Sequence, residues 1–216
     1  MKTYNSKDHL IAIHVPKTAG TSVKNIFKHW FKENMHLHYY DGIENRLPDK
    51  VELDKNDTPK VIYGHFNSSK KFGISDYYPQ VNQFTAILRE PFQRVISGYK
   101  YLSRSEDINR RPNTSLENYL IQNKSNFLYH FPTQVTEENY IDVIESMFIE
   151  IGVIEHLHES MTRIAQKLNK PFNVNMIKKL NVSKENFKIP YHVKDQFIEN
   201  HALEYKVYEY VLSKYS

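Results

Sequence analysis

The chain has 216 residues, with 29 Lys or Arg, 25 Asp or Glu, 11 His, no Cys and a formal net charge of +4. Its 40% hydrophobic and 25% charged composition excludes a disordered chain, a collagen and a coiled coil, and the lack of cysteine excludes disulfides, zinc–thiolate sites, iron–sulfur clusters and thiol nucleophiles. The small positive charge is too weak to indicate a nucleic-acid partner and suits an anionic ligand.

The first elements follow a strand–turn–helix pattern. Leu10–Val15 is a short apolar run that ends before a proline, which predicts a buried strand. From Thr21 the apolar residues recur with helical spacing as far as Phe31, so we expect an amphipathic helix with Thr21 or Ser22 near its N-cap. The polar stretch Met35–Lys60, which holds two prolines, is predicted to be irregular.

The rest of the chain continues the alternation. Val61–Tyr63 and Phe84–Leu88 are predicted strands, and Pro91 fits the first turn of the helix that follows. Later predictions are a capping box at Thr114 and Glu117, a helix from Thr136 to about Ser146, a strand at Phe148–Ile154, and helices at Leu157–Leu168 and Val193–Tyr215. This order predicts an α/β fold, a three-layer sandwich around a mainly parallel sheet.

Length and apolar patterning also predict the organisation of the chain. We expect one domain over residues 1–216. No apolar run is long enough for an integral membrane segment, and the run near the N-terminus is too short for a signal peptide, so we expect a cytoplasmic protein. The six glycines are far fewer than the roughly fifteen of average composition, so we expect them where the backbone needs them.

The turn after the first strand has the residues of an anion site. Free backbone N–H groups at a helix start attract an anion, and Lys17 adds a positive charge. Gly20 would let the backbone approach an oxyanion, and hydroxyls come from Thr18, Thr21 and Ser22. The plainer interpretation is an ordinary turn with a helix cap.

A second strand tip carries similar chemistry. Arg89 ends the strand at Phe84–Leu88, where open α/β sheets bind ligands, and Ser97 lies two turns into the next helix. Arg offers a planar fork to a phosphate, and Ser offers one further donor. The alternative is an Arg–Glu surface pair with Ser97 as filler. Two such tips suggest a ligand with two separated anionic groups.

The segments HVPKTAGTS and LREPFQRVISGY together closely resemble the carbohydrate sulfotransferases of the family-2, heparan-sulfate-type group. Weaker matches at YGHF, IGVIEHLHES, LNVS and the Tyr-rich end extend the resemblance over most of the chain. The resemblance implies a P-loop-like phosphosulfate-binding loop, the sulfuryl donor 3′-phosphoadenosine 5′-phosphosulfate (PAPS), the product 3′-phosphoadenosine 5′-phosphate (PAP), and no metal. It also implies an acceptor that is a glycan, a glycolipid or a small hydroxyl-bearing molecule.

The resemblance also implies roles for individual residues. The 5′-phosphosulfate would bind at Lys17, Thr18, Ala19, Gly20, Thr21 and Ser22. The 3′-phosphate would bind at Arg89 and Ser97, and the late match places Asn181 and Ser183 near the nucleotide.

Transfer to a sugar hydroxyl needs a general base, because such a hydroxyl is not ionised near neutral pH. His65 follows a predicted strand and would lie at the same sheet edge as both phosphate motifs, and the resemblance places a catalytic histidine at this position. We therefore expect His65 to be the base and Lys17 to neutralise the leaving group. His14 is the rival base, and a half-buried structural histidine is the alternative for His65.

Several alternatives stay open at this level. The pairs His36/His38 and His156/His158 allow a metal hypothesis, although no third ligand is evident. Six tyrosines could stack on sugar or adenine, although most of them are expected in the core or at its rim: Tyr39, Tyr40, Tyr77, Tyr78, Tyr99 and Tyr101. The role of Glu155 is undecided. Five basic residues could favour an acidic saccharide or be solvated surface charge: Lys70, Lys71, Arg104, Arg110 and Arg111.

Two other functions compete with sulfuryl transfer. A P-loop-type nucleotide kinase shares the strand–loop–helix phosphate site but places its lysine directly before the helical Ser or Thr, whereas Lys17 lies four residues before Thr21. A non-catalytic nucleotide-binding module would keep Lys17 and Arg89 without needing His65.

Overall fold

A five-stranded parallel sheet forms the centre of the computed structural model, which describes residues 1–41, 46–54, 58–177 and 187–215. Its strand order is β2-β3-β1-β4-β5. The strands are β1 (Leu10–Ile13), β2 (Met35–His38), β3 (Val61–Gly64), β4 (Phe84–Leu88) and β5 (Phe148–Val153). The three inner strands β3, β1 and β4 and the edge strand β5 are buried along their whole length, which explains their continuous apolar runs.

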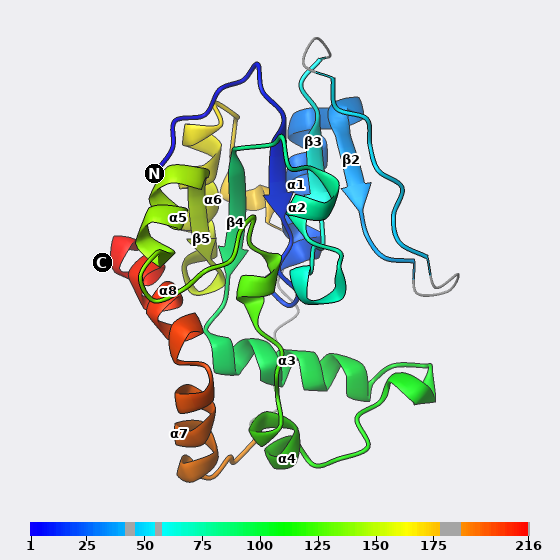
Figure 1. Cartoon of the computed structure of the whole chain (residues 1–216), viewed down its shortest axis with the longest axis vertical. Helices are drawn as coiled ribbons and strands as arrows, with labels where there is room; N and C mark the ends of the chain where they lie inside the picture. Colours follow the sequence, from blue (N-terminus) through cyan, green and yellow to red (C-terminus); the bar gives the residue numbers. More distant parts are fainter. Residues whose placement is uncertain (42–45, 55–57, 178–186, 216) are drawn as a thin grey trace.

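Helices cover both faces of the sheet and make the three predicted layers (Figure 1). On one face, α1 (Gly20–Phe31) and α6 (Leu157–Lys167) pack on the sheet through side chains such as Phe27 and Met161. On the other face lie α2 (Ile74–Tyr77), α5 (Tyr140–Met147) and α8 (Ala202–Leu212). The predicted α/β sandwich is thus confirmed, and its sheet is parallel throughout.

A further group of helices lies beyond the carboxyl ends of the strands. Figure 1 shows α3 (Pro91–Ser103) running across these ends, with α4 (Leu116–Ile121) and α7 (Tyr191–Asn200) below it. The three helices share a small core that includes Phe92, Leu120 and Phe197. This group of helices therefore lies next to the carboxyl ends of the strands, where both predicted anion sites are found.

Two predicted segments differ from the structure. Met35–Lys60 is not wholly irregular, because its first four residues form β2, a short edge strand that is mostly half-exposed and so lacks a clear apolar run. Val193–Tyr215 is not one helix: α7 and α8 are separated by His201, whose φ is −121°. The buried His201 ring contacts Glu204 and, through Nε2, the carbonyl of Asn123 at 3.2 Å, and these contacts fix the break.

Helix starts also differ from the predicted caps. Ser115 rather than Thr114 caps α4, accepting a hydrogen bond from the Asn118 N–H, and a turn over residues 137–139 precedes α5.

Two of the predicted nucleotide-binding residues, Asn181 and Ser183, lie outside the described residues. Within the described ranges, no helix has the length and apolar character that a membrane span requires.

Candidate active site

The loop between β1 and α1 presents a row of free backbone donors. Lys17 and Ala19 both adopt left-handed backbone conformations, with φ of 73° and 61°. Non-glycine residues rarely adopt this conformation, and such turns direct successive N–H groups into one concavity. The N–H groups of residues 17–21 make no hydrogen bond to the described part of the chain. They form a concave donor surface at the start of α1 that suits an oxyanion.

The hydroxyl groups of this loop are used differently from one another. Thr18 is buried and its hydroxyl donates to the carbonyl of Val15 at 2.8 Å, so that hydroxyl stabilises the loop from inside. Thr21 is exposed and Ser22 is half-buried, and both lie in the first turn of α1. Neither caps the helix: the N-cap is Ala19, which has no side-chain cap, and this leaves the first amides available.

Lys17 extends from the loop toward α3. Its Nζ lies 4.0 Å from the ring centroid of Tyr101. Burial lowers the pKa of the Lys17 ammonium, and the nearby Arg89 guanidinium lowers it further. No carboxylate in the described ranges pairs with Lys17, so an incoming anion would be its first full counter-charge.

Arg89 lies beside the same loop because β4 and β1 are neighbours in the sheet. Its Nη1 donates to the carbonyl of Lys17 at 3.3 Å, which joins the two predicted anion sites. Burial lowers the pKa of Arg89, and the charges of Glu155 and Glu90 oppose this shift. Glu155 also accepts a hydrogen bond from the Glu90 N–H at 3.0 Å, so it holds the turn between β4 and α3.

The remaining predicted residues are more dispersed. Ser97 lies half-buried on α3, two turns after Arg89. Lys70 and Lys71 are exposed at the short helix η2 (Ser68–Lys70), close after His65 in the chain. Arg110 and Arg111 are exposed and follow the carboxyl end of α3 by several residues, whereas Arg89 precedes the start of that helix.

His65 has the geometry of a general base. Its Nδ1 lies 2.6 Å from the carbonyl oxygen of His14, and because a carbonyl only accepts, Nδ1 must carry the proton. The neutral ring therefore has its lone pair on Nε2, which has no partner among the described residues. Burial lowers the pKa of His65, opposed by the hydrogen bond to His14, so the base is neutral at physiological pH.

His14 supports this base and is poorly suited to act as one. Its Nδ1 lies 2.8 Å from the Tyr39 hydroxyl, and its ring stacks on that of His65 with centroids 4.2 Å apart. Its Nε2 faces Gly20 so closely that a Cβ added there would lie 1.7 Å away. Burial is the largest cause of the low pKa of His14, and together with the electrostatic effect of nearby groups, first His65, it lowers that pKa to about 2. Both ring nitrogens are therefore enclosed, and the ring stays neutral.

Three residues at the site make contacts that the sequence does not predict, although Tyr39 and Tyr101 are among the tyrosines considered for stacking on a ligand. Tyr39 contacts both histidines, with its ring edge-on to His65 at 4.8 Å. His130, on the short helix η4 (Phe127–His130), is buried with its ring 6.4 Å from that of His65, and burial lowers its pKa to about 3. Tyr101 contacts Lys17. Their common signal is only a polar or aromatic residue near a strand end or on a helix face, which is too general to select them.

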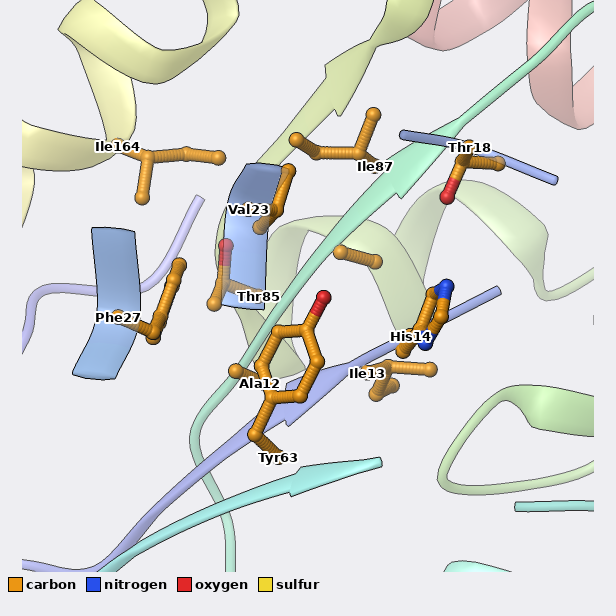
Figure 2. A pocket seen from close by; sticks show the side chains of 11 residues that line it. Ala12, Ile13, His14, Thr18, Val23, Phe27, Tyr63, Thr85, Ile87 and Ile164 are labelled. Atoms are coloured by element: carbon orange, nitrogen blue, oxygen red, sulfur yellow. The ribbon is translucent and has the colours of Figure 1, made fainter. Parts of the chain in front are cut away.

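A small cavity lined in part by residues of the loop and of β1 has no room for a ligand. Figure 2 shows His14, Thr18 and Tyr63 among the side chains that line it. Its volume of about 10 Å³ is at most that of one water molecule. An anionic ligand does not fit this cavity, whereas the amides of residues 17–21 make no hydrogen bond with the described part of the chain.

The histidine pairs do not form a metal centre. His38 is buried and its ring stacks against those of Phe66 and Phe72, whereas His36 lies on the half-exposed part of β2. His156 and His158 are both exposed at the start of α6. In the part of the chain that the structure describes, no three His, Asp or Glu side chains gather at metal-binding spacing.

Comparison with known proteins agrees with these features. A sequence model described as "Sulfotransferase family" matches residues 3–187. No curated protein matches the chain. Among solved structures, mouse sulfotransferase SULT7A1 complexed with PAP is similar, with a TM-score of 0.46 and 14% identity over 81% of this chain. The chain spans 63% of the length of that protein.

The contact between His14 and Gly20 generates a stability prediction. Gly20→Ala places a methyl group in the imidazole of His14, which cannot shift freely because Tyr39 and His65 hold it. We expect a loss of about 1–3 kcal/mol in the free energy of unfolding, measured by urea denaturation. The control is Gly98→Ala on α3, where nothing lies within 4 Å of the new Cβ; it should gain up to about 1 kcal/mol. Equal stability of Gly20→Ala and the native chain would refute the packing argument.

Proposed function

The chain belongs to the sulfotransferase family, and from this membership we propose that it transfers a sulfuryl group from PAPS to a hydroxyl acceptor. The observation that carries the proposal is the free donor row at residues 17–21 with the two cations Lys17 and Arg89. Beside it, at the end of the neighbouring strand β3, lies His65, whose Nε2 has no partner among the described residues. Anion binding and proton abstraction are the two requirements of sulfuryl transfer, and both are supported at this edge of the sheet.

The residues present fit the two charged ends of PAPS. The amides of residues 17–21 and the Lys17 ammonium would hold the 5′-phosphosulfate, with Thr21 and Ser22 as further donors. Thr18 would contribute its amide, since its hydroxyl is bound to Val15. Arg89 and Ser97 would hold the 3′-phosphate from the neighbouring strand tip and from α3.

When bound, PAPS supplies a sulfuryl group whose bond to the phosphate oxygen breaks as the acceptor oxygen bonds to sulfur. His65 Nε2 takes the proton of the acceptor hydroxyl and becomes positively charged. The carbonyl of His14 stabilises that charge through the Nδ1–H and keeps the ring oriented. Lys17 neutralises the charge that develops on the leaving phosphate. Burial lowers the pKa of His65 and so favours the neutral ring that accepts the proton. Burial also lowers the pKa of Lys17, and an anion bound beside the ammonium would oppose that shift and favour the charged form.

A carbohydrate or glycolipid is the proposed acceptor class. The Ser68 hydroxyl donates to the carbonyl of Tyr129 at 3.2 Å, which joins η2 and η4 on the side of His65. These turns expose an aromatic ring at Tyr129 and ammonium groups at Lys70 and Lys71. Aromatic faces and cations suit sugar rings and acidic sugars, respectively.

The experiment that tests the function is transfer from sulfur-labelled PAPS to a panel of neutral glycans, acidic glycans, glycolipids and phenols. Titration with PAP and with ATP, with and without Mg²⁺, accompanies it. We expect PAP to bind without Mg²⁺ and label to reach a glycan or glycolipid. Preference for Mg²⁺–ATP would instead support a kinase, and PAP binding without transfer to any hydroxyl would support a binding module.

The role of His65 predicts a separation of binding from turnover. His65→Ala should lower the transfer rate about 10²- to 10⁴-fold, because the general base is lost, while PAP affinity stays within about two-fold. The rate is measured with labelled PAPS and the affinity by calorimetry. The control is His158→Ala, an exposed position on α6, which should match the native chain in both. Full activity of His65→Ala would exclude His65 as the base.

The two lowered pKa values predict the pH dependence of kcat/KM. The neutral form of His65 is active, so activity falls as pH drops through its pKa, which burial places below 6.5. The charged form of Lys17 is active, so activity falls as pH rises through a pKa below 10.5. Lys17→Arg should move the alkaline limb upward because the guanidinium stays charged. An acid limb centred above pH 6.5 would contradict the assignment of His65.

The role of Arg89 predicts a ligand-specific loss of affinity. Arg89→Ala should weaken PAP binding about 10- to 100-fold, the effect of losing a charge-assisted phosphate contact. Binding of adenosine 5′-phosphate, which lacks the 3′-phosphate, should change little, and this comparison corrects for the hydrogen bond from Arg89 to Lys17. Arg110→Ala, an exposed position beyond α3, is the matched control. Equal losses for both nucleotides would place the 3′-phosphate elsewhere.

A further inference from the structure

We infer that Tyr101 is a positioning residue for Lys17, holding its ammonium on the ring face at the gap between the first loop and α3. The inference rests on the proposed function for its catalytic meaning, but the contact itself is a property of the chain. The Lys17 Nζ lies 4.0 Å from the ring centroid of Tyr101, within the range of a cation–π interaction.

The surroundings of Lys17 make this contact important. The lysine approaches from a left-handed backbone position and its nearest charged neighbour is another cation, Arg89. No carboxylate in the described ranges pairs with it. The electron-rich face of Tyr101 is therefore the one group among the described residues shown to attract the ammonium.

Packing does not account for Tyr101. Its side chain is 57% exposed, its ring contacts no other aromatic ring in the described ranges, and its hydroxyl has no hydrogen-bond partner there. A residue with this exposure contributes little to the core. The contact of its ring face with Lys17 therefore distinguishes Tyr101, and neither its hydroxyl nor burial accounts for its position.

The place of Tyr101 on α3 gives the contact a mechanistic consequence. Tyr101 follows Ser97 by four residues, so the two side chains share one face of the helix. Lys17 serves the 5′ end of the donor in the proposed function, and Ser97 serves the 3′ end. By holding Lys17 one turn from Ser97, the ring sets the spacing of the two anion-binding groups before the donor binds.

Three proteins test the inference: the native chain, Tyr101→Phe and Tyr101→Leu. Phe keeps the ring face, whereas Leu removes it and still favours a helix. The first measurement is the rate at which an amine-acylating ester labels Lys17, read by mass spectrometry, with the exposed Lys28 on α1 as internal reference. The second is kcat and KM for labelled PAPS, together with PAP affinity and the melting temperature.

Tyr101→Leu should label Lys17 about two- to five-fold faster and lower kcat by a similar factor, because the ring no longer shields and orients the ammonium. The affinity for PAP should fall by a similar factor, because the spacing of Lys17 and Ser97 is no longer set before binding. Lys28 labelling should stay unchanged, and Tyr101→Phe should match the native chain throughout. Unchanged Lys17 labelling in Tyr101→Leu, or an equal loss in Tyr101→Phe, would overturn the inference. If the native chain neither binds PAP nor transfers label, the proposed function fails, while the labelling rates still decide whether Tyr101 holds Lys17.

Discussion

The hydrogen bond from His65 Nδ1 to the carbonyl of His14 organises this edge of the sheet. It joins the end of β3 to the residue that follows β1, and it leaves the other ring nitrogen of His65 as the proton acceptor. The His14 ring then fills the space above Gly20, which fixes where α1 can begin and hence where the free amides lie. One residue thus sets the tautomer of the base and the position of the anion-binding loop.

Much of this arrangement follows from the sequence because the strands are parallel. Four strands are buried and have continuous apolar runs, so their ends are visible, and the motif residues that follow them must meet at one edge. The order of the strands therefore predicts that Lys17, Arg89 and His65 lie near one another. In the structure, Arg89 donates a hydrogen bond to the carbonyl of Lys17. The short edge strand β2 escapes it because only one of its residues is fully buried.

What the sequence does not reveal are contacts between distant segments and unusual backbone conformations. Nothing local to His130 or Tyr101 indicates that one approaches His65 and the other Lys17. The inward bond of the Thr18 hydroxyl depends on the left-handed residues on either side of it, and their conformation is unfavourable for a lysine and an alanine in isolation. The break at His201 likewise depends on the Asn123 carbonyl, from a segment that precedes α5 and β5.

The position of β1 at the centre of the sheet has a consequence for how the protein is made. Leu10 pairs with Val61 on one side and Ile11 with Phe84 on the other, so β1 has neither partner until much later segments have been synthesised. Contacts this distant along the chain close slowly, and an apolar strand without partners is prone to mispairing during synthesis. The anion-binding loop is thus translated well before α6, whose Ile164 lines the same small cavity as Thr18 of the loop.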